Sequence, residues 1–154
     1  MRVLVIVDHP RPSSLTHAVA GALAKGLSEA GHSHEILDLY ASGFDPRMIP
    51  EDEPDWDDAA KRYSPTVQIE IARLKRADAL AFVFPVWWWG LPAMTKGYID
   101  RCFARGFAYG GATLPHHRAL WLGLAAADAA TFDKRGYRDA LKVQLDIGIA
   151  DYCG

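Results

Sequence analysis

Hydrophobic residues along this chain gather in short apolar runs that predict buried strands. Residues 3–7 form an all-aliphatic run, and residues 79–84 and 119–125 form two more. Runs of this length are typical of strands covered on both faces of a parallel sheet. Residues 34–39 alternate imperfectly between polar and apolar side chains and predict a further strand, the second in chain order.

Segments with helical spacing separate these strands. Apolar residues recur every four positions across residues 15–30, before Gly31 as a stop, at Leu15, Val19, Leu23 and Leu27. Similar spacing, or a proline at the first helical position, predicts helices over residues 66–76, 92–105 and 136–149. Strands and helices therefore alternate, which predicts one three-layer α/β domain, a doubly wound parallel sheet with helices on both faces.

Ligands of such a sheet bind at the carboxyl ends of the strands, near the point where the strand order reverses. The loops after the first, third and fourth predicted strands would meet at this edge. Three segments that are far apart in the sequence, residues 9–16, 85–92 and 125–131, are therefore expected to converge on one crevice.

The first loop offers donors that suit a phosphate. Ser13, Ser14 and Thr16 stand at the start of the predicted helix, whose free amides and positive dipole end favour an anion, and Arg11 adds charge. The alternative is that Ser13 or Ser14 simply caps the helix. The loop lacks a glycine-rich turn, which argues against a dinucleotide-binding or Walker loop. His9 is interpreted as a structural or phosphate-side residue rather than a proton donor.

Three consecutive tryptophans mark the second loop. Neighbouring side chains of an extended segment point in opposite directions, so Trp87, Trp88 and Trp89 cannot all enter one core, and at least one should line a surface or pocket. An isoalloxazine ring needs a flat apolar contact beside backbone donors and acceptors, which makes a flavin site the leading hypothesis. A packed aromatic cluster or a subunit interface is the alternative.

The third loop is nearly bare of functional side chains, since residues 125–131 read AAADAAT. Small side chains would let backbone amides approach a ligand closely. An alanine-rich run is equally typical of a flexible or helical connector, so this loop by itself indicates little.

Composition narrows the partners and the compartment. The chain has 154 residues, 50% hydrophobic and 23% charged, with a formal net charge of -2, which disfavours nucleic acid as a partner. No run approaches the roughly 20 apolar residues of a membrane span, and the apolar run at residues 2–7 is too short for a signal peptide. With only the two cysteines Cys102 and Cys153, the chain is expected in the reducing cytoplasm and not within a membrane.

Charged and titratable residues elsewhere have simpler interpretations. Acidic residues dominate residues 45–58, which predicts a solvated excursion. A solvated face is also the simplest account of the basic residues on the third predicted helix, although an interface or a cofactor phosphate is an alternative; they are Lys96, Arg101 and Arg105. Cys102 is expected to be buried rather than nucleophilic.

The histidines outside the first loop do not predict a metal site. Adjacent residues such as His116 and His117 rarely converge on one ion, and no carboxylate or thiol accompanies them in the pattern. The remaining histidines are expected at the surface of a helix and its following turn; they are His17, His32 and His34.

The stretch FPVWWWGLPAMTKGYIDRCFARGFAY, residues 84–109, resembles a motif of the flavodoxin-like NAD(P)H:quinone oxidoreductase family. That motif reads FP-x-x-W-x-G-x-P-A-x-x-K-G, then an aromatic residue, an acid followed by arginine, and FAY. Further matching pieces occur in the same order: the loop after His9, DLY at residues 38–40, FDP at 44–46 and YCG at 152–154. The resemblance covers nearly the whole chain.

This resemblance implies a flavodoxin-like fold with strand order 2-1-3-4-(5), in a homodimer whose active site is shared across the subunit interface. A flavin would lie at the carboxyl edge of each sheet, with FAD favoured over FMN and NAD(P)H as co-substrate. The family continues into a fifth strand and a final helix beyond the position of Gly154, so the expectation is a single domain, residues 1–154, that lacks this tail.

Residue by residue, the resemblance implies the following cofactor contacts. The pyrophosphate and ribityl chain would meet His9, Ser13, Leu15, Thr16 and Ala18. The isoalloxazine loop would comprise Pro85, Val86, Trp87, Trp88 and Trp89, with Trp88 the best-matched ring. The family's Thr-Thr-Gly-Gly loop is replaced, with both hydroxyls and both glycines lost, by Ala125, Ala126, Ala127 and Asp128.

The implied activity is a ping-pong reaction. NAD(P)H would give a hydride to the flavin and leave, and a quinone or similar flat acceptor would take its place. The tyrosine and histidine that assist this transfer in the mammalian members have no secure counterpart, and Tyr137 is the catalytic candidate. The alternatives are a flavin-binding regulatory subunit of a transporter and a one-electron flavodoxin carrier.

Overall fold

A parallel four-stranded sheet forms the centre of the protein. In the computed structural model, which describes residues 1–58, 60–116 and 118–154, its strands are β1 (Arg2–Val7), β2 (Ser33–Asp38), β3 (Ala79–Pro85) and β4 (Ala119–Leu124). Their order is β2-β1-β3-β4, with Val5 of β1 level with Ile36 of β2 and Ala81 of β3. The expected flavodoxin-like fold class and the order of these strands are thereby confirmed.

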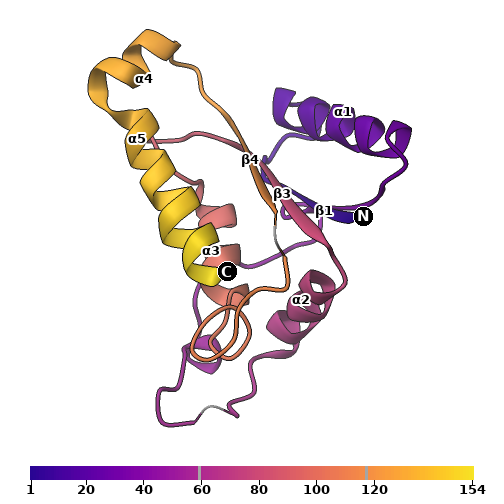
Figure 1. Cartoon of the computed structure of the whole chain (residues 1–154), viewed down its shortest axis with the longest axis vertical. Coiled ribbons are helices and arrows are strands. Elements are labelled where there is room, and N and C mark those ends of the chain that lie inside the picture. Colours follow the sequence, from indigo (N-terminus) through magenta and orange to yellow (C-terminus); the bar gives the residue numbers. More distant parts are fainter. Residues whose placement is uncertain (59, 117) are drawn as a thin grey trace.

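Helices connect the strands and cover the sheet. They are α1 (Leu15–Glu29), α2 (Pro65–Lys75), α3 (Ala93–Cys102), α4 (Ala129–Arg135) and α5 (Tyr137–Lys142), with the 3-10 turn η1 (Pro50–Asp52) and the π-helical segment η2 (Val143–Asp151). Figure 1 shows α1 on one side of the strands and α2 and α3 on the other. Within the described residues, no helix is both long and apolar enough to cross a membrane.

Alternate residues of the strands feed two separate hydrophobic cores. Val3, Val5 and Val7 pack with Ala20 on the α1 face, while Leu4 and its neighbours pack against α2 and α3 on the opposite face. Successive side chains of a strand point to opposite faces, so a strand buried on both sides must be apolar throughout. This is why the unbroken runs in the sequence predicted the strands correctly.

Two helical expectations need correction. Leu15 was counted in the apolar stripe of α1 but is 70% exposed, whereas Val19 and Leu23 do pack on the core. The predicted helix over residues 136–149 is observed as α5 continued by the π-helical η2, and a separate helix that was not predicted, α4, precedes it. Gly136, in the left-handed conformation with φ 70°, ends α4 before α5 begins, because a residue without Cβ adopts that helix-ending conformation at little steric cost.

A buried carboxylate joins the end of β1 to the start of α3. Asp8 is fully buried; its Oδ2 accepts the Thr95 amide at 2.7 Å and the Thr95 hydroxyl at 2.6 Å. The Asp8 amide donates to the Val83 carbonyl of β3 at 3.0 Å. Burial raises the pKa of Asp8, although the two bonds from Thr95 oppose the shift. The second oxygen, Oδ1, is buried without a partner in the described structure.

The acidic excursion is not simply solvated, and neither is Arg101. Asp52 is 2% exposed and Arg101 4% exposed, and their side chains form an ion pair at 2.6 Å. The Ser64 amide and hydroxyl also donate to Asp52, and the Arg101 guanidinium donates to the Asp45 carbonyl. Although burial opposes it, the bonds from Arg101 and Ser64 hold the pKa of Asp52 below its usual range. The ion pair between the Asp52 carboxylate and Arg101 therefore holds the excursion against α3.

Replacing Arg101 by leucine should leave the Asp52 carboxylate buried without its cation. Loss of one member of a buried pair costs about 3–5 kcal/mol, so Arg101→Leu should lower the free energy of unfolding in urea by that amount. The matched control is Arg47→Ala, which removes an exposed guanidinium paired with Asp45 and should leave stability unchanged. Equal effects of the two substitutions would contradict the assignment.

Asp8→Asn should raise stability at neutral pH. The folded chain holds the Asp8 proton above the ordinary pKa of 3.8, so ionisation of the buried carboxyl removes stability as pH rises through the folded pKa. Asparagine keeps an acceptor for Thr95 and stays neutral. The advantage of the variant, measured by urea unfolding at several pH values, should be present at pH 7, shrink as pH falls through the raised folded pKa, and be gone below about 4. A pH-independent loss of stability would refute this.

Candidate active site

The three predicted loops do converge at the carboxyl edge of the sheet. The ring centroid of His9, in the first loop, lies 6.1 Å from that of Trp87 in the second. The Val86 amide at the base of the second loop donates to the Leu124 carbonyl at 2.8 Å, just before the third. A cavity of about 210 Å³ lies between the second and third loops and is lined by Val86, Trp88, Trp89 and residues 125–127.

The first loop places donors at the start of α1. Ser14 is the N-cap, and its Oγ accepts the His17 amide at 3.3 Å, so the capping alternative holds for Ser14. The amides of Leu15 and Thr16 precede the first intrahelical bond, which the Ala18 amide makes to the Ser14 carbonyl. Leu15 and Thr16 can therefore offer amides to an anion, whereas Ala18 cannot.

His9 is a donor toward the crevice through one ring nitrogen. The Arg11 amide donates to His9 Nδ1 at 3.1 Å, so a neutral imidazole carries its proton on Nε2. Ser13 is exposed at the rim of the same loop. These groups form a neutral donor set around the positive end of α1.

His17 is not the surface residue that was expected. Its Nε2 lies 2.9 Å from Asp38 Oδ2 and its Nδ1 lies 3.0 Å from Ser14 Oγ, so the ring bridges the end of β2 and the start of α1. Asp38 also accepts the amides of Tyr40 and Ala41. Although burial opposes it, these bonds and His17 hold the pKa of Asp38 below its usual range. Helical periodicity gave no sign of this contact because Asp38 lies in another element.

The tryptophan loop is a tight turn in a strained conformation. Trp88 and Trp89 have positive φ angles of 50° and 61°, and the Gly90 amide donates to the Trp87 carbonyl at 3.2 Å. Two consecutive left-handed residues define a type I′ turn, which normally takes asparagine and glycine. For side chains with Cβ, this conformation costs roughly 1–2 kcal/mol per residue. Such strain is typical of functional sites.

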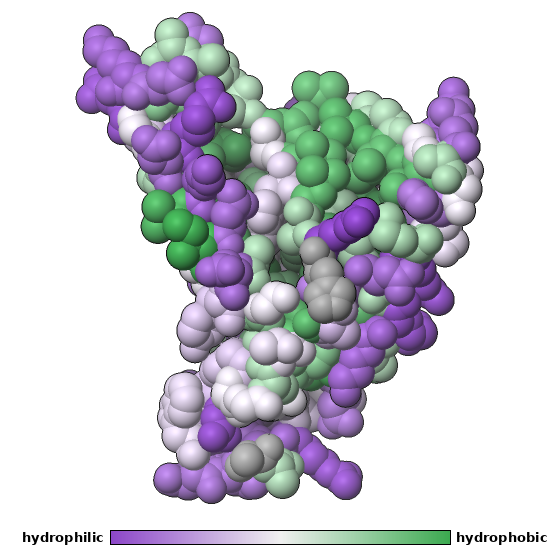
Figure 2. All heavy atoms as spheres, in the orientation of Figure 1, coloured by the Kyte–Doolittle hydropathy of each residue, from purple (hydrophilic) through white to green (hydrophobic). Residues whose placement is uncertain are grey.

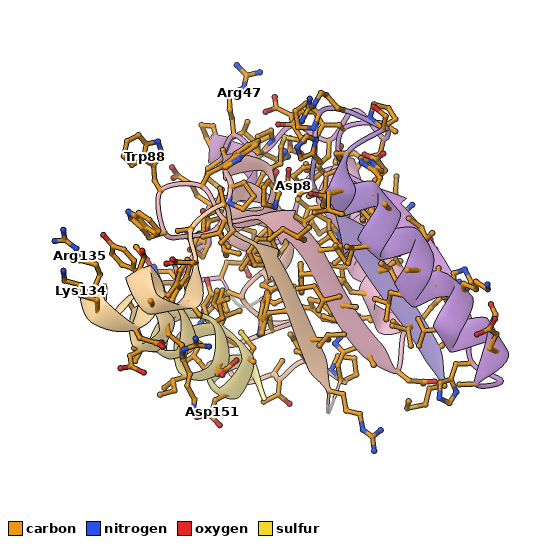
Figure 3. All side chains as sticks on the ribbon, turned by 90° about the horizontal axis from the view of Figure 1, so that it is seen from above. Asp8, Arg47, Trp88, Lys134, Arg135 and Asp151 are labelled. Carbon is orange, nitrogen blue, oxygen red and sulfur yellow. The ribbon has the colours of Figure 1, made fainter. Side chains whose placement is uncertain are left out.

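The three indoles have different surroundings. Trp88 is 95% exposed, and Figure 3 shows its ring standing clear of the ribbon. Trp89 stacks on Tyr137 with centroids 3.9 Å apart and planes 11° apart, and meets Phe132 edge-on at 5.6 Å. Aromatic pairs contribute about 0.5–1.5 kcal/mol each beyond area burial, which is comparable with the strain of the turn. The sequence singled out Tyr137 but missed Phe132.

The third loop presents backbone rather than side chains. Asp128 is the N-cap of α4, and its carboxylate accepts the Thr131 amide at 2.9 Å; hydrogen bonding from the Thr131 side chain and from this amide holds the pKa of Asp128 below its usual range. Gly123 permits the close approach of β4 to the second loop, because a Cβ there would lie 2.9 Å from Val86 Cγ2. The small residues 125–127 of this loop line the cavity.

A second, wider hollow adjoins the site. It has a volume of about 530 Å³ and is lined by residues of β4, the third loop, α4 and α5, among them Trp121, Ala125, Phe132 and Leu141. In Figure 2 hydrophobic side chains gather over β4, in the space between α5 and α1. The cavity at the tryptophan loop therefore adjoins a hollow that is apolar along β4 and that is also lined by the charged residues Arg138, Lys142 and Asp146.

Outside the three loops, the described residues add no thiol or metal chemistry to this site. Cys102 is buried, and burial raises the pKa of its thiol far above the usual range, so it is not a nucleophile. Among the described residues, no group of three or more histidine, cysteine or acidic side chains could hold a metal ion. His116 is buried with Nε2 2.8 Å from the Leu74 carbonyl, and His117 lies outside the described residues.

The whole chain matches known proteins of one kind. The family model described as a flavodoxin-like fold matches residues 1–154. The uncharacterized NAD(P)H oxidoreductase YcaK of Escherichia coli is 43% identical over 137 residues, which are 88% of this chain and 70% of that protein. NAD(P)H dehydrogenase [quinone] 1 of Cavia porcellus is 32% identical over 123 residues, 70% of this chain but 45% of that protein.

A solved structure extends the match to three dimensions. The NAD(P)H:quinone oxidoreductase of Methanothermobacter marburgensis superposes with a TM-score of 0.89 at 33% identity, covering 93% of this chain and 73% of that chain. The chain thus spans about 70% of its bacterial relative and less than half of the mammalian one. The chain belongs to the flavodoxin-like family of NAD(P)H:quinone oxidoreductases, as its motifs indicated.

Proposed function

We propose that this protein binds a flavin at the carboxyl edge of its sheet and uses it to carry two electrons from NAD(P)H to quinones or similar flat acceptors. The observation that carries the proposal is the meeting of a strained, exposed tryptophan turn with the donor-bearing start of α1 at one edge of the sheet. The names of the relatives agree with this activity.

The residues present fit a flavin phosphate at the first loop. An anion at the start of α1 would meet the amides of Leu15 and Thr16 at the positive end of a 15-residue helix, with the Ser13 hydroxyl and His9 Nε2 beside them. Ala18 would contribute contact but no amide. FAD is the proposed cofactor on family grounds, with FMN as the alternative.

The second and third loops fit a flat ring with a polar edge. Trp88 offers an exposed indole, and Trp88 and Trp89 both line the cavity. The Val86 amide is committed to Leu124, so Pro85 and Val86 would serve as an apolar floor. Residues 125–127 line the far side, where their amides would meet the edge of the ring, and the Asp128 carboxylate caps α4.

The bound flavin would supply hydride acceptance and release, and the protein would supply position and electrostatics. The tryptophan turn would exclude water and align a flat donor or acceptor against the ring. Backbone amides aimed at its polar edge would stabilise negative charge that develops there. The proposed order is ping-pong, in which the flat donor leaves before the flat acceptor takes the same place against the ring. We also propose that the protein is a cytoplasmic homodimer in which the partner subunit completes each active site.

The direct test is the purified protein itself. Its absorption spectrum should show flavin bands, and the released cofactor should be FAD by mass spectrometry. After loading with FAD or FMN, NAD(P)H oxidation should depend on menadione and give parallel double-reciprocal lines. Protein from flavin-rich cells that carries no flavin and takes up none on reconstitution would overturn the proposal.

The same preparation separates the enzyme from a regulatory flavoprotein. A protein that binds flavin but oxidises no NAD(P)H with any quinone, azo dye or nitroaromatic acceptor would be a flavin-dependent regulator. One-electron reduction through a stable radical would favour a flavodoxin carrier.

Trp88→Asn should separate stability from function. Asparagine tolerates the left-handed conformation, and the Trp88 ring packs on nothing, so the free energy of unfolding should rise by about 1 kcal/mol. Flavin affinity should fall up to about tenfold because a ring face is lost. Trp56→Asn, which removes another exposed indole far along the chain, is the control and should leave flavin affinity unchanged. A variant with unaltered flavin binding would remove Trp88 from the site.

A further inference from the structure

The left-handed tryptophans need an external restraint. Trp88 and Trp89 both have positive φ, and a hydrogen bond from the Gly90 amide to the Trp87 carbonyl closes the turn. Trp88 is almost wholly exposed and so cannot hold the turn by packing. A strained conformation persists when the surrounding structure over-determines it. The restraint must therefore act through Trp89.

Two aromatic rings from a distant part of the chain hold Trp89. Tyr137 stacks face to face on the indole, and Phe132 meets both rings nearly at right angles, with interplanar angles of 75° to Trp89 and 80° to Tyr137. These three rings, Trp89, Phe132 and Tyr137, are called the aromatic clasp below. Gly136 lies between the two C-terminal members, and its left-handed backbone turns the chain from α4 into α5.

The ring contacts of the clasp join the α4–α5 corner to the tryptophan loop. Neither α4 nor α5 has a fully buried residue, although Leu141 of α5, about one turn beyond Tyr137, packs partly buried against the hydrophobic core. In Figure 3 the Lys134 and Arg135 side chains of this corner project into solvent. The clasp thus joins an exposed corner to a strained turn. Its ring contacts restrain the position of the turn and that of the corner.

We propose that Tyr137 is a positioning residue that holds the tryptophan turn in its binding shape through its ring, with Phe132 as a second support, and that its hydroxyl is not required. The inference rests on the proposed flavin site and specifies what Tyr137 does there. The stack uses the ring face, and the structure shows no hydrogen bond from the Tyr137 hydroxyl among the described residues.

The first test needs no flavin. Hydrogen exchange of the Gly90 amide reports opening of the turn, because that amide closes it. In the cofactor-free protein, Tyr137→Ala should speed this exchange about tenfold, whereas Tyr137→Phe should match the wild type. Tyr152→Ala, which removes an exposed tyrosine near the end of the chain, is the matched control and should also leave it unchanged. Exchange at Gly90 that is equal in all four proteins would overturn the clasp.

The second test measures the consequence for the site. Flavin affinity by fluorescence titration should fall about tenfold in Tyr137→Ala and be retained in Tyr137→Phe, together with kcat. A Tyr137→Phe protein that binds flavin normally but loses kcat, with a changed pH profile, would show that the hydroxyl acts and overturn the proposal. If Tyr137→Ala fails to fold by circular dichroism, Phe132→Leu replaces it, with a smaller change expected in the same direction.

The two proposals fail in distinguishable ways. Wild-type protein that binds no flavin would contradict the proposed function. Hydrogen exchange of the Gly90 amide in the cofactor-free variants would still test the clasp. If the wild-type protein binds flavin and the Tyr137→Ala variant has the same Gly90 exchange and flavin affinity, the clasp is contradicted. The proposed flavin site is then unaffected.

Discussion

The bond from Thr95 to the buried Asp8 carboxylate is the contact on which the arrangement of the site depends. It fixes the start of α3 against the end of β1, while the Asp8 amide fixes the same point to Val83 of β3. The tryptophan loop runs between β3 and α3, so both of its ends are set by this junction. The carboxylate lies at the positive end of a helix but leaves one oxygen buried and unpaired. The junction therefore gains rigidity at the expense of stability.

Because both ends of the loop are fixed, its middle can hold a strained backbone conformation. Between the Val86 amide, held by Leu124, and the fixed start of α3, the chain passes through two left-handed tryptophans. One points into solvent, where it can meet a ligand, and the other is held by rings from the α4–α5 corner. Trp88 is available to a ligand and Trp89 holds the turn. These different roles give a physical reason for two adjacent tryptophans that do not share one core.

The departure of the third loop from the family pattern also has a local explanation. Asp128 takes the N-cap of α4, which starts a helix immediately after the alanines. The side chains of residues 125–127 are small enough for backbone to line the cavity in place of hydroxyls and glycines. The loop is thus shaped by the helix that follows it, and that helix carries Phe132 to the clasp.

The sequence by itself determined the strands, their order along the chain and the three loops of the site. A strand covered on both faces must be apolar throughout, and the family motif is a local string, so both can be read without knowing any distant contact. Leu15 shows the limit of periodicity, because a helix end can extend beyond the core and leave an apolar residue exposed.

Only the tertiary structure decided which polar and aromatic residues pair. One acidic residue among several, Asp52, is buried on Arg101, and Asp8 is buried against Thr95, 87 positions away. The ring that Trp89 stacks on is Tyr137 of another helix. In the sequence, such residues look the same whether their side chains face water or pair with another residue. Their burial depends on where the packed elements bring distant segments together, and that geometry is not written in any local pattern.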